Sequence, residues 1–427
     1  MRFDIPYGLL GESLPHSFSK ELHEKLGRYQ YEMIEVPRDR LDEYMTRHEF
    51  TAINVSIPYK EAVIPYLDEI SERARKIGAV NTIVNRGGKL FGDNTDFGGL
   101  EALIRRMGLD FTGKKVLIGG TGGTSKTSRA VAEHLGAREI VRVSRTGREG
   151  ATVYGDAVAK HGDADIYINA TPCGMFPETQ NSPVDLRHFP MLSGVVDVIY
   201  NPLTTQLVRE ARENGITAEN GLYMLVAQAV LASEIFTGEP YPEDTIDRVF
   251  GEMVFEKRNI VLTGMPGCGK TTLGRLLADQ LGRPLCDMDE IIVARTGMPI
   301  TEIFKARGEA VFRDMETRLL RELCQSGEKI IATGGGAVLR KENVDLMKMN
   351  GTVVFLDRAP EGLLPTDDRP LADNAEKIRA LYETRYPIYT AASEITLRVE
   401  GTPEHSAEEL ISALKLYLPG VPGAKGR

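Results

Sequence analysis

The sequence predicts an α/β protein of about three domains, in which two glycine loops each connect a buried strand to a helix. The first loop follows the largely apolar run 115–119, and the second follows the apolar run 259–263. The second loop has the pattern of a phosphate-binding loop (P-loop), which usually opens its own domain. In a chain of 427 residues, the roughly 250 residues before that loop must therefore form something else.

Composition and charge are those of an ordinary globular protein and argue against several functions. Apolar residues make up 42% of the chain and charged residues 26%. A net charge of −9 disfavours a nucleic-acid-binding surface. We expect no signal peptide, and the most apolar run, 221–236, is interrupted by Gln228 and Glu234 and does not predict a membrane span. The four cysteines form no C-x-x-C pair, which favours reduced thiols in a cytoplasmic protein.

The amino-terminal part alternates short apolar runs with helical patterns. Ser17 or Ser19 is placed to cap the first helix, and Pro58 stands where a helix begins, with Lys60 in its first turn. A single lysine is most often a solvated surface group, so its role depends on what lies near it. The expected elements are strands at 7–11 and 52–57, a helix at 17–27, and polar loops at 78–82 and 92–98.

The loop after residue 119 is a variant of the dinucleotide-binding fingerprint G-x-G-x-x-G, and a helix is expected at 128–135. The next strand, 139–143, lies about 20 residues further along the chain, at the position where this fold binds the ribose of the dinucleotide. An NAD enzyme would place an acidic residue there. Two arginines and two hydroxyls stand there instead, which suit a 2′-phosphate, so we predict NADP as the cofactor. The loop residues are Gly120, Thr121, Gly122, Gly123 and Thr124, and the ribose-reading residues are Ser144, Arg145, Thr146 and Arg148.

Two further apolar strands, 164–171 and 195–202, run into loops that contain proline. The helix expected at 222–235 is apolar around most of its circumference and is therefore buried. Gln228 in its middle is a polar group that needs a partner. That partner is either a structural hydrogen bond or a substrate.

Taken together, the motifs before residue 250 resemble the shikimate dehydrogenase family, which reduces 3-dehydroshikimate with NADPH. The motifs are Pro15-His-Ser-Phe-Ser19, Asn54-Val-Ser-Ile-Pro-Tyr-Lys-Glu61, Gly78-Ala-Val-Asn-Thr82, Gly92-Asp-Asn-Thr-Asp96, Gly120-Thr-Gly-Gly-Thr124, Ile168-Asn-Ala-Thr171 and Gly221-Leu-Tyr-Met-Leu-Val-Ala-Gln228. The resemblance implies that the substrate is bound by Ser17, Ser19, Ser56, Lys60, Asn81, Asp96, Tyr200 and Gln228. It also assigns Val198 and Gly221 to the cofactor.

In this family a lysine and an aspartate form the catalytic pair, here Lys60 and Asp96. Ketone reduction needs a proton donor beside the carbonyl and a counter-charge that orients it, and such a pair supplies both. The run 146–163 is short, so one βα unit of the Rossmann half is expected to be reduced.

The second glycine loop fits the G-x-x-x-x-G-K-[ST] pattern. Its glycines let backbone N–H groups turn toward a phosphate chain, and the helix that follows adds its partial positive charge. Lys270 can reach the β- and γ-phosphates of ATP, and the Thr271 hydroxyl can bind Mg²⁺. The nucleotide-binding residues of this loop are Gly267, Cys268, Gly269, Lys270, Thr271 and Thr272.

Paired carboxylates follow the P-loop helix. Asp287 and Asp289 occupy alternating positions and would point the same way if the strand there continues. Such a pair suits Mg²⁺ and an acceptor hydroxyl. Further along, a buried strand runs into Gly334–Gly336, where the backbone can approach a ligand closely.

These features resemble the shikimate kinase family over residues 257–418, which has a P-loop fold of the nucleoside-monophosphate-kinase type. The resemblance implies Mg²⁺ at Thr271 and Asp287, the acceptor hydroxyl at Asp289, and shikimate at Arg313, Gly335 and Arg385. It places Arg369 on a lid that meets the phosphates. The run 356–368 is shorter than in the family, and the adenine-packing arginine of the family has no counterpart, since Arg358 is poorly positioned.

We therefore predict a bifunctional enzyme that reduces 3-dehydroshikimate with NADPH and phosphorylates shikimate with ATP and Mg²⁺. Its partners would be small molecules, with neither nucleic acid nor membrane among them. Two alternatives stay open: a dehydrogenase half that acts on quinate, and a sensor or repressor that kept both folds and lost the chemistry. The expected domains are a substrate domain at 1–100 with helices from 221–250, a Rossmann domain at 101–220 and a kinase domain at 257–418, with a charged joint at 251–258 and a flexible tail at 419–427.

Overall fold

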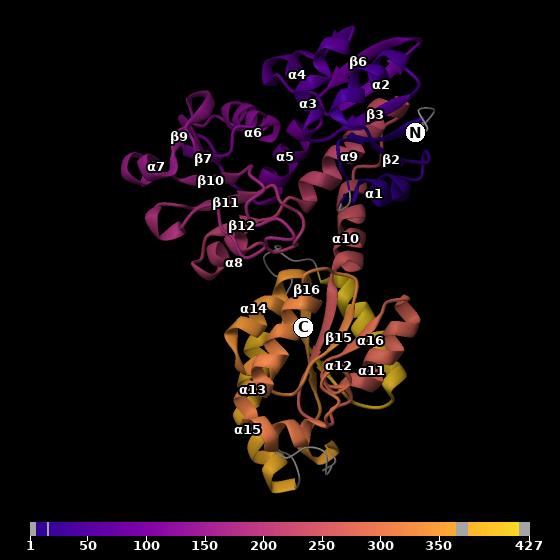
Figure 1. Cartoon of the computed structure of the whole chain (residues 1–427), viewed down its shortest axis with the longest axis vertical. Helices are drawn as coiled ribbons and strands as arrows, with labels where there is room; N and C mark the ends of the chain where they lie inside the picture. The colour runs from indigo at the N-terminus through magenta and orange to yellow at the C-terminus, as the bar shows by residue number, and fades with distance from the viewer. Residues whose placement is uncertain (1–5, 15–16, 364–374, 418–427) are drawn as a thin grey trace. The chain divides into compact units, whose positions relative to one another are not determined.

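Figure 1 shows the computed structural model, which describes residues 6–14, 17–363 and 375–417. The strands of these residues form three sheets. The chain divides into two compact units, one made of residues 1–201 and 205–250 and the other of residues 202–204 and 251–427. Two sheets lie in the first unit and one in the second, and the predicted α/β class is confirmed.

The first sheet is mixed and has the strand order β2-β1-β3-β5-β6-β4. β2, β1 and β3 run parallel, whereas β5 is antiparallel to both β3 and β6. Its core includes the fully buried side chains of Leu10, Ile53, Ile83 and Leu90. The elements are β1 (Tyr7–Gly11), α1 (Ser19–Leu26), β2 (Glu32–Glu35), α2 (Leu41–Arg47), β3 (Ala52–Val55), α3 (Tyr59–Ala62), β4 (Glu69–Ile70), α4 (Glu72–Ile77), β5 (Thr82–Arg86) and β6 (Lys89–Asp93).

The serines predicted to cap the first helix do not act as its N-cap. The N-cap residue of α1 is Phe18, whose side chain cannot accept a hydrogen bond. Ser17 Oγ instead donates to Ser19 Oγ at 3.0 Å and accepts from the Ser19 N–H at 3.3 Å. The two hydroxyls are thus held next to each other at the start of the helix.

The second sheet is parallel throughout and has the order β12-β11-β10-β7-β8-β9. Its strands β7 and β10 are buried along their whole length, as expected for a sheet covered on both faces. The predicted reduced unit is the two-residue strand β9 with the eight-residue helix α7. The elements are β7 (Lys115–Gly119), α6 (Gly123–His134), β8 (Glu139–Ser144), β9 (Thr152–Val153), α7 (Tyr154–His161), β10 (Ile166–Asn169), β11 (Gly194–Asp197), α8 (Gln206–Glu213) and β12 (Thr217–Glu219).

Helices α5 (Asp96–Arg106) and α9 (Leu222–Thr237) cross closely within the first unit (Figure 1). A side chain at Gly99 would lie 2.6 Å from Met224 O and 3.0 Å from Gln228 Cβ. Because only glycine permits this approach, the sequence at this point fixes the crossing. α9 also contacts α1, so the late helix returns to the first sheet as the resemblance implied.

The third sheet is parallel, with the order β14-β15-β13-β16-β17. The P-loop leaves the carboxyl end of its central strand, β13. The elements are β13 (Asn259–Thr263), α11 (Lys270–Leu281), β14 (Leu285–Asp287), α12 (Met288–Thr296), α13 (Ile300–Leu323), β15 (Ile330–Ala332), α14 (Lys341–Asn350), β16 (Gly351–Asp357), α15 (Ala375–Ala392), β17 (Ile395–Arg398) and α16 (Pro403–Leu416).

The segment predicted as a charged joint is helical. α10 runs from Thr245 to Lys257 and includes the division between the two units at Phe250 and Gly251. β13 then begins at Asn259. The joint is therefore the second half of a helix rather than an irregular linker.

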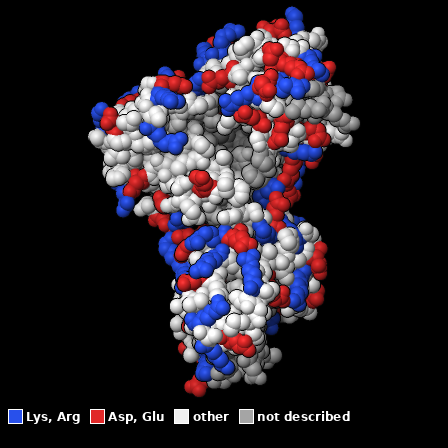
Figure 2. All heavy atoms as spheres, in the orientation of Figure 1, with Lys and Arg blue, Asp and Glu red and all other residues white. Residues whose placement is uncertain are grey.

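Acidic and basic side chains are interspersed over the face of the molecule drawn in Figure 2. None of the described helices is long and apolar enough to cross a membrane. The predicted tail at 419–427 lies outside the described residues. The predicted domain boundaries stay predictions, although each sheet falls within one of the predicted ranges.

Candidate active sites

The predicted catalytic pair of the first unit is formed in the structure. Lys60 lies in the short helix α3, and Asp96 is the first residue of α5. Lys60 Nζ donates to Asp96 Oδ2 at 2.6 Å, and the two side chains are 16% and 9% exposed. The carboxylate at a helix N-terminus, where negative charge is favoured, can hold the ammonium group in one place beside a substrate.

Asn81 and Gln228 lie in one buried polar cluster with Thr95, the residue before the predicted catalytic aspartate. Asn81 Nδ2 donates to Thr95 Oγ1 at 3.0 Å and to Gln228 Oε1 at 3.5 Å, while Thr95 N–H donates to Asn81 Oδ1 at 2.7 Å. Gln228 Nε2 donates to the carbonyl of Leu225 in its own helix at 2.9 Å. Gln228 therefore has the structural partner that a buried amide needs and also lies beside a second predicted substrate residue.

Ser17 and Phe18, which precede α1, lie beside Tyr200. The rings of Phe18 and Tyr200 are 5.2 Å apart between centroids. Burial raises the pKa of the Tyr200 phenol, and a hydrogen bond with Ser17 acts in the opposite direction. Ser56 lies on the turn into α3, because its carbonyl accepts from the Tyr59 N–H at 2.9 Å. Its hydroxyl thus lies close in the chain to the predicted catalytic lysine.

The dinucleotide-type loop lies against Lys60, the predicted catalytic lysine. A side chain at Gly123 would begin 3.6 Å from both Cβ and Cδ of Lys60. α6 begins at Gly123 rather than at the predicted Ser128, so its unsatisfied N–H groups lie directly at the loop. Lys126 of the same helix pairs with Glu61 of α3 at 2.7 Å. A cofactor held by this loop would therefore lie next to the predicted proton donor.

The other predicted cofactor residues lie at the carboxyl ends of the parallel strands, where dinucleotides bind. Gly120 has a φ of 107°, and a side chain there would come within 2.8 Å of Ala170 O. A side chain at Gly221 would overlap the carbonyl of Val198. Val198 N–H in turn donates to Asn169 O at 3.1 Å. These loops are therefore packed so closely that their backbones can form a cradle for a flat ligand.

The ribose-reading residues follow β8. Ser144 Oγ accepts from the Gly147 N–H at 3.0 Å and closes the turn. Arg145, Thr146 and Arg148 are not buried. Among the described residues, neither arginine has an acidic partner. Two unpaired guanidinium groups at this position fit a 2′-phosphate, and the residues present therefore fit NADP.

In the second unit most of the predicted residues line one cleft of about 710 Å³. This volume is in the range of small-molecule sites. Cys268 does not line the cleft, because its side chain is fully buried in the core, so only its backbone can face a phosphate. The predicted residues on the walls are Gly267, Gly269, Lys270, Thr271, Thr272, Asp287, Asp289, Arg313, Gly334, Gly335, Gly336 and Arg385.

The P-loop lysine lies over its own loop. Lys270 Nζ donates to the carbonyls of Gly264 and Met265, both at 3.0 Å. Thr271 Oγ1 donates to Asp287 Oδ2 at 2.6 Å. The loop thus presents an ammonium group and a hydroxyl–carboxylate pair at the start of α11.

The two aspartates line the cleft, but the local structure that places them there differs from the predicted one. β14 ends at Asp287, which caps α12 by accepting from the N–H groups of Asp289 and Glu290 at 3.0 and 3.2 Å. The strand does not continue past Asp287. The prediction that both side chains point the same way because they alternate along a strand is therefore wrong. The first turn of α12 brings both carboxylates to the cleft instead.

The oxygens of Thr271 and Asp287 fit Mg²⁺, which takes one or two carboxylates and completes its shell with phosphate oxygens and water. Among the described residues there is no group of three metal-ligating side chains. The pair of donors suits a cation that arrives with a nucleotide.

Arg313 is fixed beside the second aspartate by a buried acid. Its Nη1 donates to Glu316 Oε2 at 2.6 Å, and Nη2 donates to Glu309 Oε1 at 2.8 Å. Glu316 is fully buried. Burial raises the pKa of Glu316, Arg313 lowers it, and nearby Asp289 raises it. The two acids therefore hold the guanidinium in one orientation at the wall of the cleft.

The triple glycine lies against these residues. A side chain at Gly336 would overlap the Arg313 guanidinium, and one at Gly334 would come within 3.2 Å of Asp289 Oδ1. Gly335 O accepts from Arg385 Nη1 at 3.0 Å and from the Tyr389 hydroxyl at 2.5 Å. Gly334 and Gly336 thus leave room for charged side chains, and the carbonyl of Gly335 orients Arg385.

Arg369, the predicted lid residue, lies outside the described residues. Two residues that position the site were not predicted from the sequence. Glu316 stands three residues after Arg313, and Tyr389 four after Arg385, so each shares a helix face with the arginine that it supports. That spacing is the signal that could have found them.

Comparison with known proteins agrees with this geometry. Residues 9–83 match the family described as Shikimate dehydrogenase substrate binding domain, and residues 266–415 match the family described as Shikimate kinase. A protein of Clostridium perfringens named Shikimate dehydrogenase (NADP(+)) is 34% identical over 265 residues, which cover 58% of this chain and 97% of that protein. A protein of Halothermothrix orenii with the same name is 38% identical over 260 residues, covering 54% and 90%.

Solved structures give the same result for the first unit. Shikimate dehydrogenase 1 of Peptoclostridium difficile is 32% identical with a TM-score of 0.54, covering 58% of this chain and 97% of that one. A chorismate mutase/shikimate 5-dehydrogenase fusion protein of Clostridium acetobutylicum is 36% identical with a TM-score of 0.55, covering 59% and 97%. The Thermus thermophilus shikimate 5-dehydrogenase, solved in complex with NADP(H) and shikimate, is 29% identical with a TM-score of 0.52, covering 58% and 99%.

Proposed function

Since the chain belongs to the shikimate dehydrogenase family and carries a shikimate kinase domain, we propose that it catalyses two consecutive reactions of the shikimate pathway. The first unit reduces 3-dehydroshikimate to shikimate with NADPH. The second unit transfers the γ-phosphoryl group of ATP to shikimate. The observation that carries the proposal is that one chain holds both the Lys60–Asp96 pair and the P-loop cleft.

In the first unit, Lys60 gives its proton to the carbonyl oxygen of the substrate as that oxygen gains negative charge. NADPH supplies the hydride when bound. Asp96, at 2.6 Å from the ammonium group, orients the donor and balances its charge. The hydroxyls and amides around the pair hold the ring of the substrate; they are Ser17, Ser19, Ser56, Asn81, Tyr200 and Gln228.

The dinucleotide-type loop holds the pyrophosphate of NADPH, since backbone N–H groups at the start of α6 can bind it. Arg145 and Arg148 hold the 2′-phosphate, with Ser144 and Thr146 beside them. Val198 and Gly221 line the place of the nicotinamide. This arrangement brings the reducing end of the cofactor toward Lys60, because Gly123 at the end of the loop lies beside that side chain.

In the second unit, Arg313 and Arg385 hold the carboxylate of shikimate, since guanidinium groups bind carboxylates in a bidentate manner. Asp289 accepts the hydrogen of the attacking hydroxyl and orients it. Lys270 leaves its loop carbonyls to bind phosphate oxygens, and Thr271 with Asp287 would hold Mg²⁺, which neutralises charge on the transferred group. Arg369 is proposed to approach the phosphates from the lid.

We place the enzyme in the cytoplasm, with small molecules as its partners. All four cysteines of the chain are free thiols, as expected in a reducing compartment.

The two activities can be tested separately on the full chain. NADPH oxidation is measured with 3-dehydroshikimate alone, and ADP release is measured with shikimate, ATP and Mg²⁺. Lys60→Ala should abolish only the first activity and Lys270→Ala only the second. If the unchanged protein lacks either activity, the proposal is wrong for that unit.

A further inference from the structure

The carboxylate pair and the triple glycine of the second unit lie on one side of its central strand. Asp287 and Asp289 follow β14, and Gly334–Gly336 follow β15, and both strands stand on the same side of β13 in the sheet order. β16 and β17 stand on the other side. Because ligands of parallel sheets lie at the carboxyl ends of the strands, a nucleotide with its γ-phosphate in the cleft has its remaining atoms toward the ends of β16 and β17.

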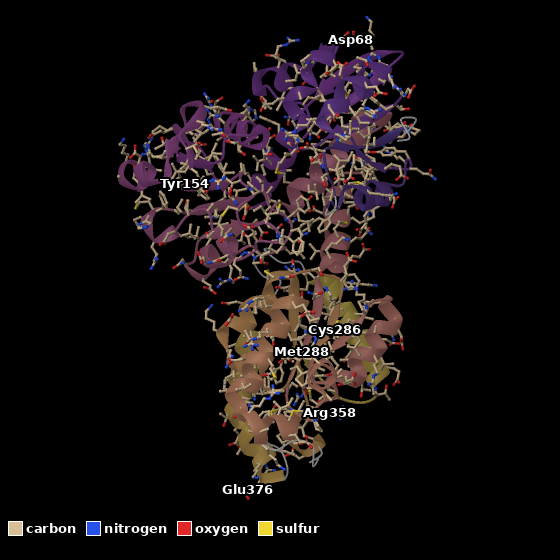
Figure 3. The ribbon with its side chains drawn as sticks, viewed as in Figure 1. Asp68, Tyr154, Cys286, Met288, Arg358 and Glu376 are labelled. Atoms are coloured by element: carbon tan, nitrogen blue, oxygen red, sulfur yellow. The ribbon has the colours of Figure 1, made fainter. Side chains whose placement is uncertain are left out.

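Arg358 is the first residue beyond β16 at this place (labelled in Figure 3). β16 runs beside β13 with Phe355 paired to Thr263, and a side chain at Gly264 would come within 2.7 Å of Leu356 O. Arg358 Nη2 lies 3.9 Å from the position of a side chain at Gly269, the last P-loop glycine before Lys270. The guanidinium therefore lies over the P-loop. The expectation that Arg358 is poorly positioned to pack on adenine stays a prediction.

Packing of its stem, rather than an acidic partner among the described residues, holds the Arg358 side chain there. Arg358 has no ion pair among the described residues, and its Nε is buried without a hydrogen-bond partner. Its stem packs on Gly362, where a side chain would lie 3.3 Å from Arg358 Cγ. By contrast, Arg379 and Arg398 in the same unit pair with Glu361 and Glu400.

Three positive features therefore meet at the P-loop. They are the N-terminus of the twelve-residue helix α11, the ammonium group of Lys270 and the guanidinium of Arg358. A buried N–H without an acceptor is costly, and so is a cluster of like charges. An anion with several acceptor oxygens removes both costs. The face of a stacked base offers no acceptor, so the geometry favours a phosphate over the adenine ring.

We propose that Arg358 binds the phosphate chain of ATP on its nucleoside side, from outside the P-loop, and so fixes the nucleotide for transfer. The inference rests on the proposed kinase function and adds a nucleotide-binding residue to it. Arginine suits this role because its planar fork donates two parallel hydrogen bonds to a phosphate.

The test is calorimetric titration of the full chain with ADP and with inorganic tripolyphosphate. Arg358→Ala should weaken the binding of both by about tenfold or more, the effect of losing a charged hydrogen bond. Arg358→Lys should recover part of the affinity because it keeps the charge. Arg295→Ala is the matched control, since Arg295 pairs with Glu322 on the surface of the same unit, and it should bind both ligands as the unchanged protein does.

Unchanged affinity of Arg358→Ala for ADP would overturn the inference. Loss of ADP affinity with unchanged tripolyphosphate affinity would also overturn it, because the arginine would then contact the adenosine. The inference would likewise be overturned if the unchanged protein did not bind tripolyphosphate. If the thermal transition shows that Arg358→Ala does not fold, Arg358→Lys is used in its place. A bidentate contact is contradicted if Arg358→Lys binds both ligands as tightly as the unchanged protein does. A protein that binds ADP through Arg358 but does not phosphorylate shikimate would contradict only the proposed function.

Discussion

At the scale of single residues, a charged side chain in each candidate site lies in direct contact with a partner of opposite sign. Lys60 and Asp96 form such a pair in the first unit, and Arg313 and Glu316 in the second. An unpaired charge at these depths would be costly. Each pair also lies among the residues proposed to hold substrate, so the pairing fixes the direction of a charged group as well as balancing it.

Lys60→Ala should lower kcat of the dehydrogenase reaction by about 10²-fold or more with little change in KM, because the proton donor acts at the transition state. Steady-state kinetics with NADPH measures both constants. Lys20→Ala is the matched control, since Lys20 pairs with Glu32 at the surface, and it should leave both constants unchanged. A rise in KM alone would make Lys60 a binding residue.

The first unit should prefer NADPH to NADH, because Arg145 and Arg148 replace an acidic ribose reader. Arg145→Ala should lower kcat/KM for NADPH by about tenfold, the cost of one charged hydrogen bond, and leave that for NADH unchanged. Arg129→Ala, which removes a surface pair with Glu133, serves as the control. Equal use of both cofactors by the unchanged protein would contradict the assignment.

Asp197 should make the stability of the first unit depend on pH. It is fully buried and accepts from Thr205 Oγ1 at 2.7 Å and from Asn169 Nδ2 at 3.0 Å. Burial raises its pKa to about 7 from an ordinary value of 3.8. The folded protein therefore keeps a proton that the unfolded chain releases, so the contribution of Asp197 to stability is full below about pH 4 and falls as pH rises toward 7.

This loss of stability with rising pH should be absent in Asp197→Asn, whose side chain cannot ionise. The measurement is the thermal unfolding midpoint of the first unit between about pH 5 and 8. The midpoint of the unchanged protein should fall more steeply with pH than that of the variant. Parallel curves would show that Asp197 is already ionised in the folded state.

At the scale of elements, the sites are built where strands end and glycines remove side chains. Gly99 lets α5 and α9 cross, which brings Gln228 to Asn81, and Gly336 leaves room for the Arg313 guanidinium. Neither glycine has a positive φ. Close approach of neighbouring groups, rather than backbone strain, is therefore the reason for glycine at both positions.

Gly336→Ala should displace the Arg313 guanidinium and raise KM for shikimate in the kinase reaction by about tenfold or more, since small misplacements of binding groups are costly. Dehydrogenase activity should not change, because the substitution lies in the other unit. ADP release at varied shikimate concentration gives KM, and an unchanged value would mean that Arg313 does not hold shikimate.

Much of this arrangement could be predicted from the sequence because it is local. Both glycine loops carry their strand, turn and helix within one stretch of chain, and Lys60 and Asp96 lie in motifs of their own. What depends on tertiary structure could not be predicted. The pairing of β16 with β13, which brings Arg358 to the P-loop, joins residues far apart in sequence. The start of α12 at Met288, which turns Asp289 into the cleft, is by contrast a local effect of the Asp287 cap, and an acidic N-cap is the signal that could have predicted it.

At the scale of the whole molecule, two enzymes share one chain through α10, a helix that belongs to both units. Each unit has its own sheet or sheets and its own candidate site. The product of the first reaction is the substrate of the second. The central claim is therefore that one polypeptide performs both steps.

The most direct measurement supplies the full chain with 3-dehydroshikimate, NADPH, ATP and Mg²⁺ and follows the products by mass spectrometry. The account predicts that shikimate 3-phosphate forms, that Lys60→Ala leaves 3-dehydroshikimate unconsumed, and that Lys270→Ala stops the sequence at shikimate. Formation of shikimate without its phosphate by the unchanged protein, or no consumption of 3-dehydroshikimate at all, would contradict it.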